Sequence, residues 1–255
     1  MIRYRNAQEI DLIRTACRIV ADVLQRLRAM VLPGATTADL DRMAEEWTLK
    51  AGARPAFKGY RPAGGSVRYP ATLCVSINEE IVHGIPSPKR VLHEGDIVGL
   101  DFGVVSEGYY GDAAITVPVG KVAPRAAELI EVTRTALEHG VAQARVGNRV
   151  RDVSASIQAH VEAHGFSVVR DFVGHGIGQQ LHEEPQVPNY VAHGQNPRLR
   201  QGLVLAIEPM VCLGGYEVEV LEDGWTAVTQ DRQKSAHFEH SVAILASGPE
   251  ILTTV

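Results

Sequence analysis

The sequence lacks the marks of several protein classes. Its three cysteines, Cys17, Cys74 and Cys212, are isolated and odd in number, so we expect reduced thiols and neither a disulfide framework nor a CxxC zinc module. No segment approaches the roughly 20 consecutive apolar residues of a membrane-spanning helix. Charged residues interrupt the apolar positions of residues 1–30, so we expect a helix there rather than a signal peptide. A net charge of −5 without a basic stripe argues against nucleic acid as a specific partner.

What the sequence does contain favours one globular domain over residues 1–255. A hydrophobic content of 45% is ample for a packed core. Asn6 and Glu9 predict a capping box for a helix over residues 7–30, and Thr37 is expected to cap a second helix that ends near Lys50.

The rest of the chain alternates between strands and helices. Apolar, β-branched segments bounded by glycine and proline predict strands over 72–82, 96–106 and 109–119, and helical periodicity predicts helices over 124–145 and 150–164. Further strands are expected within 203–213, 216–221, 225–230 and 235–245, with a hairpin across the EDG sequence at 222–224. This order predicts an α+β fold made of two similar halves.

Two aspartates lie inside strands that should be buried. Asp101 interrupts the apolar run IVGLDFGVV, and Asp112 interrupts YYGDAAITV. A tight turn near Ser106 and Glu107 would place the two carboxylates opposite one another. Like charges that face each other across a ladder repel, and burial adds to the cost, so the pair favours a bound divalent cation. The alternative is a surface hairpin with solvated aspartates.

Two glutamates pose the same problem. Glu208 has apolar neighbours in LVLAIEPMVCL, and Pro209 removes a ladder donor, which predicts that this strand is interrupted or lies at an edge beside a site. Glu239 begins the apolar strand of SAHFEHSVAIL. Each glutamate alone is explained equally well by a basic partner, but four such acids together favour a cation site.

Three histidines stand next to glycines or acids. His175 lies between two glycines in VGHGIG, and glycines let a histidine point into a cavity at close backbone approach. His182 follows seven residues later, a spacing that matches no compact zinc motif, and His83 precedes the glycine of VHGIP. Each alone is also explained as a turn residue. No catalytic role is assigned to the others: His93, His139, His160, His164, His193, His237 and His240.

Several separated motifs, in order along the chain, closely resemble those of type I methionine aminopeptidases: NEEIVHGIP, LDFG, GYYGDAA, GHGIG, LHEEPQVPN, IEPM and DGWTAVTQDRQKSAHFEH. The resemblance extends from Asn6 to Thr254. It implies the α+β pita-bread fold, in which pseudo-twofold halves form a curved antiparallel sheet that is flanked by helices and holds a dinuclear metal centre.

The resemblance also implies a ligand set. Asp112 and Glu239 would bridge two divalent ions, Asp101 would complete the ligands of one ion, and His175 and Glu208 those of the other. Such a set favours Mn²⁺, Fe²⁺ or Co²⁺, with Zn²⁺ and Ni²⁺ as further candidates for a native metal that ligand type does not settle. A metal-bridged hydroxide would attack the scissile carbonyl, with Glu208 as the proton shuttle.

The substrate would be held by residues at matching family positions. His182 would reach the scissile carbonyl region and His83 the amide nitrogen of the second residue. The methionine side chain would occupy an apolar pocket lined by Phe57, Tyr60, Tyr69, Cys74, Leu181 and Trp225. The chain departs from the family pattern by a longer segment at 61–70, and by Phe57, Leu181 and His237 where cysteine, an aromatic residue and glutamine are common.

The implied activity is removal of the initiator methionine from peptides and nascent chains with a small second residue. The expected setting is a cytoplasmic monomer with transient ribosome contact and no membrane partner. Two alternatives stay open: an Xaa-Pro aminopeptidase of the same fold, and a non-catalytic pita-bread protein that acts as a binding module. The intact ligand positions speak against the second alternative.

Overall fold

The computed structural model describes residues 1–62 and 67–254. Residues 63–66, which belong to the longer segment at 61–70, lie outside the described residues. The helices are α1 (Ala7–Met30), α2 (Thr37–Lys50), α3 (Pro124–Gln143) and α4 (Val150–Ala163). The strands are β1 (Arg54–Pro55), β2 (Leu73–Ile77), β3 (Glu80–Val82), β4 (Ile97–Ser106), β5 (Tyr109–Pro118), β6 (Ser167–Val168), β7 (Gly174–Gly176), β8 (Glu183–Val187), β9 (Val204–Ile207), β10 (Met210–Cys212), β11 (Val218–Val220), β12 (Ala227–Thr229), β13 (Ser235–His237), β14 (Glu239–Leu245) and β15 (Gly248–Ile251).

The helix boundaries follow from local capping. Asn6 accepts a hydrogen bond from the Glu9 amide and Glu9 returns one to Asn6, so the predicted capping box of α1 is confirmed. The predicted cap of α2 is wrong by one residue. Thr36 has the extended backbone of a cap and accepts from the Asp39 amide at 3.1 Å, whereas Thr37 is already helical. None of the helices in the described ranges is long and apolar enough to cross a bilayer.

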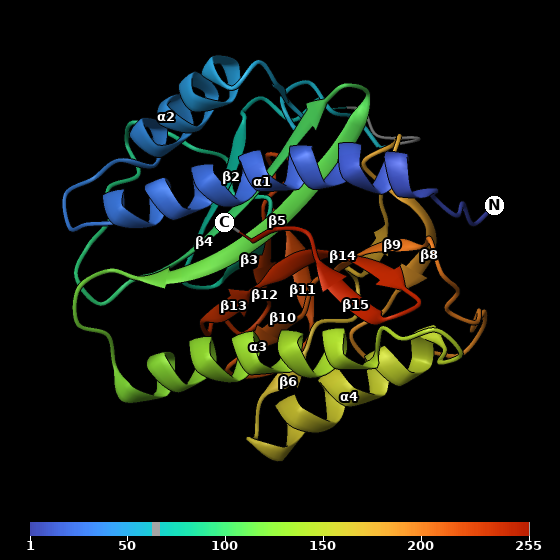
Figure 1. Cartoon of the computed structure of the whole chain (residues 1–255). Helices are drawn as coiled ribbons and strands as arrows, with labels where there is room; N and C mark the ends of the chain where they lie inside the picture. Colours follow the sequence, from blue (N-terminus) through green and yellow to red (C-terminus); the bar gives the residue numbers. More distant parts are fainter. Residues whose placement is uncertain (63–66, 255) are drawn as a thin grey trace.

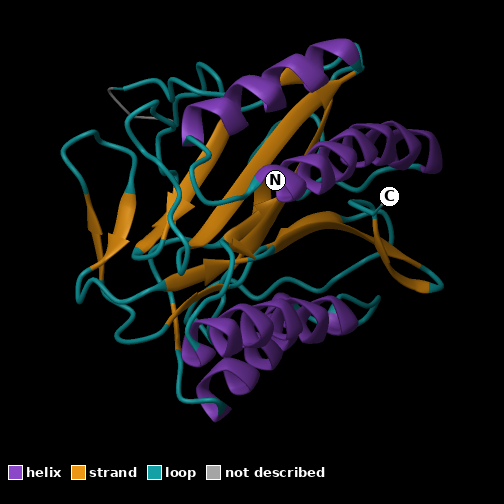
Figure 2. Cartoon of the chain, turned by 90° about the vertical axis from the view of Figure 1, so that its left-hand side faces the viewer, coloured by secondary structure: helices purple, strands orange, loops and turns teal. Residues whose placement is uncertain are grey.

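A nine-stranded antiparallel sheet lies between two pairs of helices. Its main path runs β1-β4-β5-β14-β9-β7-β8, with β2 paired to β4 and β15 paired to β14. Figures 1 and 2 show α1 and α2 on one side of the strands and α3 and α4 on the other. Separate core clusters join each helix pair to the sheet, one containing Leu24 and Phe102 and the other Leu129 and Leu205. The expected α+β class and two-part organisation are confirmed.

The β4–β5 hairpin has a different register from the one predicted. Its loop consists of Glu107 and Gly108, both with positive φ (50° and 81°), and Ser106 pairs with Tyr109. This two-residue turn sets Asp101 opposite Ala114 and Asp112 opposite Gly103. The aspartates are therefore diagonal neighbours on one face and do not lie directly opposite one another, because the turn is centred one residue later than the sequence suggested.

Helix α1 packs so closely on β5 that only glycine fits at position 111. A Cβ atom there would lie 2.6 Å from the Cys17 nitrogen and 2.8 Å from the Ala16 carbonyl carbon, both backbone atoms. At Gly99 of β4, by contrast, the nearest atom to a new Cβ is 3.6 Å away. The two glycines form a matched pair for testing this contact.

We predict that Gly111→Ala lowers the free energy of unfolding by roughly 1–3 kcal/mol, because the helix must shift away from the sheet. Gly99→Ala should have little effect. Urea denaturation of both variants measures the difference, and equal stabilities would show that α1 does not press on β5 at this position.

Candidate metal centre

Strand pairing places three of the predicted acids on one face of the sheet. Glu239 on β14 faces Ala114 of β5, and Ala114 in turn faces Asp101 of β4. Asp112 precedes Ala114 by two residues on the same strand, so its side chain points to the same face. The three carboxyl groups thus converge from three adjacent strands, although they are far apart in the sequence.

The glycines on both sides of His175 let strand β7 lie close to the backbones of its two neighbouring strands. β7 pairs with β8 on one side and with β9 on the other, where His175 faces Ala206. A Cβ atom at Gly174 would lie 2.4 Å from the Ala206 carbonyl oxygen, and one at Gly176 would lie 2.3 Å from that of Glu184. His175 Nδ1 donates to the Gly176 carbonyl at 2.9 Å. Its Nε2 therefore carries the lone pair, the arrangement typical of a metal-ligating imidazole.

Glu208 lies where a strand is broken. β9 ends at Ile207 and β10 begins at Met210, which confirms the interruption predicted from Pro209. The Glu208 carboxylate lies 3.5 Å from His175 Nε2 and 3.7 Å from His237 Nε2. His237 was assigned no role from the sequence. Its buried Nε2 atom has no hydrogen-bond partner and faces Glu208, a contact between residues 29 positions apart that the sequence does not show.

One cavity of about 460 Å³ brings all the predicted site residues together. The residues with predicted chemical roles that line it are Asp101, Asp112, His175, Glu208, Glu239, His83 and His182. The predicted pocket residues that line it are Phe57, Tyr60, Tyr69, Cys74, Leu181 and Trp225. Phe172, Val82 and Val220 also line the cavity and were not predicted. The sequence feature that could have indicated Phe172 is that it precedes the predicted ligand His175 by three residues.

No lysine or arginine lines the cavity in the described part of the chain. One oxygen each of Asp101, Asp112 and Glu239 is buried without a hydrogen-bond donor. Burial raises the pKa of Asp101 to about 7, and burial with the neighbouring acids raises the pKa of Asp112, Glu208 and Glu239 well above the usual range.

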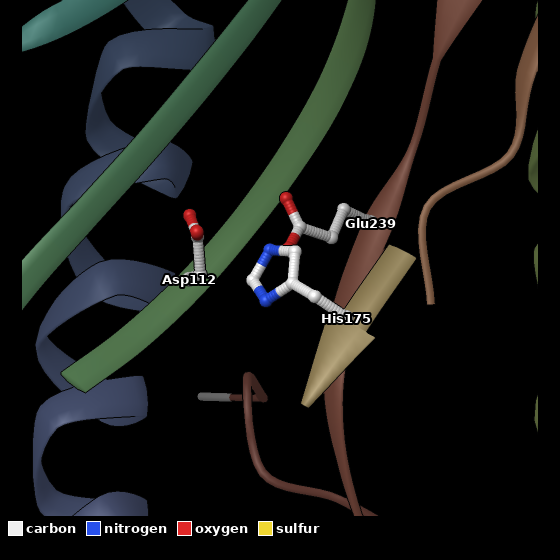
Figure 3. A group of neighbouring side chains, drawn as sticks. All are labelled: Asp112, His175 and Glu239. Atoms are coloured by element: carbon white, nitrogen blue, oxygen red, sulfur yellow. The ribbon is translucent and has the colours of Figure 1, made fainter. Parts of the chain in front are cut away.

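This donor set fits divalent cations. Ligand atoms of Asp112, His175 and Glu239 all lie within 4.8 Å of one another, and Figure 3 shows the three side chains pointing toward one another from separate strands. Burial lowers the pKa of His175 to about 3, so its imidazole is neutral and able to act as a ligand. The unpartnered oxygens point to a positive charge that no side chain of the cavity supplies.

His83 is held in an unusual backbone conformation. Its φ is 62°, and a Cβ atom on the following Gly84 would lie 2.2 Å from the Val75 carbonyl oxygen. This close approach of the chain to β2 turns the imidazole toward the cavity, where it makes edge contacts with Phe172 and Trp225 at centroid distances of 5.4 and 5.9 Å. A non-glycine residue with positive φ at a cavity wall is typical of functional sites.

His182 stands at the mouth of the cavity. Its ring centroid lies 4.3 Å from that of His175, and its Nδ1 atom lies 2.6 Å from the hydroxyl of Tyr60. The apolar wall nearby includes Tyr69, which contacts Trp225 edge-on at 5.2 Å and donates its hydroxyl to the carbonyls of Leu73 and Gly84. The cavity thus has an acidic end and an aromatic wall.

Comparisons with known proteins agree on one family. The model of metallopeptidase family M24 matches residues 11–246. The chain is 53% identical to a methionine aminopeptidase of Clostridium acetobutylicum over 253 residues, covering 99% of each protein. It is 48% identical to methionine aminopeptidase 1 of Bacillus subtilis, with both proteins covered completely.

Solved structures give the same result. A crystal structure of a methionine aminopeptidase from Thermotoga maritima matches with a TM-score of 0.95 at 48% identity, covering 100% of both chains. A prolidase from Pyrococcus furiosus matches with a TM-score of 0.79 at 21% identity. This match covers 99% of this chain and 65% of the prolidase chain. The second match shows a shared fold.

We predict that metal binding releases protons. Because the raised pKa values keep the cavity acids protonated in the metal-free protein, Mn²⁺ added at about pH 6 must displace those protons, and fewer should be released as the pH rises through about 7. Calorimetric titration in buffers of different ionisation enthalpy counts them. Glu250→Gln, an acid outside the cavity, serves as control, and a heat independent of the buffer would contradict the prediction.

Proposed function

The chain belongs to the type I methionine aminopeptidases of metallopeptidase family M24, and from this membership we propose how its residues remove an N-terminal methionine. The family match spans residues 11–246, and relatives about 50% identical over the full length carry this activity in their names. The enzyme is a metallo-exopeptidase of the pita-bread fold. The observation that carries the proposed chemistry is the group of buried acids beside which the described chain places no lysine or arginine.

Two divalent ions would be held by Asp101, Asp112, His175, Glu208 and Glu239. The donor set supports this assignment, since four carboxylates and one neutral imidazole suit Mn²⁺, Fe²⁺ or Co²⁺. When bound, such ions supply Lewis-acid polarisation of the scissile carbonyl and lower the pKa of water. Bound cations would keep the carboxylates ionised, and Asp112 and Glu239, whose strands β5 and β14 are adjacent, would be ligands that the two ions share.

Glu208 transfers the proton. Its side chain is 13% exposed, and it lies in the break between β9 and β10, directly after Ile207. From this position it accepts the proton of the attacking water and returns it to the leaving amine. His237, 3.7 Å from the Glu208 carboxylate, limits the directions in which that carboxylate turns.

His182 and His83 act on the substrate. We assign the Tyr60 hydroxyl as the donor to His182 Nδ1, 2.6 Å away, a tautomer that leaves Nε2–H as a donor toward the scissile carbonyl oxygen. His83 contacts the amide of the second residue. Burial lowers the pKa of His83 to about 4, so it acts as a neutral imidazole.

The methionine side chain occupies the aromatic end of the cavity. Phe57, Tyr69 and Leu181 are buried there, and burial raises the pKa of the Cys74 thiol well above its usual range, so the thiol stays neutral beside the thioether. A small second residue is preferred because the acids and His83 occupy the space next to the scissile bond. We place this activity on nascent chains in the cytoplasm, carried by a monomer of one catalytic domain with transient ribosome contact.

The first experiment separates the two neighbouring histidines. Hydrolysis of Met-Ala-Ser is measured for His175→Ala and His182→Ala together with bound metal. We expect His175→Ala to lose both metal and activity, and His182→Ala to retain metal while kcat falls by about 10²-fold or more. Ala-Ala-Ser and Xaa-Pro peptides serve as control substrates. Equal metal loss in both variants, or Xaa-Pro cleavage by the unmodified enzyme, would contradict the proposal.

The second experiment removes one hydroxyl. Tyr60→Phe keeps the aromatic wall but leaves His182 Nδ1 without its donor, so we expect kcat to fall about tenfold with unchanged metal content and nearly unchanged KM. Tyr216→Phe, outside the cavity, is the matched control. A kcat equal to that of the unmodified enzyme would show that the hydroxyl does not orient His182.

A further inference from the structure

A buried ion pair joins the N-terminal segment to the turn that carries His182. Arg5 and Glu183 are 178 positions apart, and the Arg5 guanidinium donates to both oxygens of the Glu183 carboxylate at 2.5 Å. The two side chains are only 4% and 6% exposed. Because solvent is excluded from this pair, its electrostatic attraction is screened far less than that of the exposed pairs along the helices.

Glu183 also closes the turn itself. One of its oxygens accepts from the backbone amides of Gln179 and Gln180 at 2.9 and 3.1 Å. The turn from 178 to 183 contains Leu181 and His182, both of which line the cavity. The carboxylate that Arg5 binds is therefore the same group that shapes the backbone on which His182 sits.

Arg5 is fixed at both ends. Its own amide donates to the Gly202 carbonyl at 2.6 Å, and a Cβ atom on Gly202 would lie 2.5 Å from the Arg5 carbonyl oxygen. At the other end, the guanidinium packs on Gly178, where a Cβ atom would lie 2.3 Å from Arg5 Nη2. Gly178 is itself tied to β5, since its carbonyl accepts from the Tyr110 amide at 2.8 Å.

We infer that Arg5 is a positioning residue that, through Glu183, holds the 178–183 turn so that His182 faces the scissile carbonyl. The inference rests on the proposed role of His182. Arg5 does not line the cavity and contacts no substrate. Its effect is on orientation, because a misplacement of about 1 Å at a reacting group can cost up to about 10²-fold in rate.

A kinetic double-mutant cycle tests this coupling. Arg5→Ala, His182→Ala and the double variant are compared with the unmodified enzyme, each loaded with Mn²⁺, on Met-Ala-Ser. We expect Arg5→Ala to lower kcat about tenfold when His182 is present and less than about twofold when it is absent, with unchanged metal content. A purely structural contribution of Arg5 would lower kcat by the same factor in both backgrounds.

Two milder variants guard against misfolding. Glu183→Gln keeps an acceptor for the turn amides, and Arg5→Lys keeps the charge without the forked geometry, so both should show the same dependence on His182 with a smaller loss. Arg14→Ala is the control, because Arg14 makes a long-range pair with Glu250 at 2.9 Å outside the cavity, although this pair is more exposed.

The outcomes separate the inference from the proposed function. Equal losses of kcat in both backgrounds, or full activity of Arg5→Ala, would overturn the positioning role while leaving the role of His182 intact. A fully active His182→Ala enzyme would refute the role of His182 itself, and the inference with it. A loss in Arg14→Ala as large as that in Arg5→Ala would also overturn the positioning role.

Discussion

The mutual repulsion of carboxyl groups in one buried cavity is the constraint on which the rest of this structure depends. Asp101, Asp112, Glu208 and Glu239 line a cavity that, in the described residues, no lysine or arginine enters. Burying an ionised carboxylate without a partner is among the most costly arrangements in a protein. The metal-free protein meets this cost by raised pKa values, and cations would meet it by coordination. Affinity for metal and instability of the empty site thus have the same origin.

Two of these acids are held within paired strands, and the other two lie beside breaks at which the backbone leaves one sheet for another. Asp101 and Asp112 lie within long paired strands, whereas Glu208 and Glu239 lie beside the interruptions that separate β9 from β10 and β13 from β14. The narrow strand β7 fits between its neighbours only because glycines flank His175. Each half of the molecule packs its own helix pair on the sheet, so the cavity between them is lined from both halves.

Much of this arrangement was predictable from the sequence, for physical reasons. Asp101 and Glu208 stood out because an acid in an apolar strand needs an explanation, and Pro209 marked the break. The hairpin register was wrong because a shift of one residue in the turn changes every pairing. Strand β7 is too short and too rich in glycine to be recognised by periodicity. The roles proposed for His237 and Arg5 depend on contacts between segments far apart in the chain, which no local pattern reports.

The two kinds of function are carried by different parts of the chain. The proposed metal ligands occupy or adjoin the central strands, which pack against helices. The groups that would meet the substrate come from connections: Tyr60 from the segment before β2, His83 from a residue with positive φ, and His182 from a turn. Such connections need anchors, because a catalytic histidine on a loop is useful only if the loop has one conformation. The buried pair of Arg5 with Glu183 and the Tyr60 hydroxyl bond supply those anchors from two sides of His182.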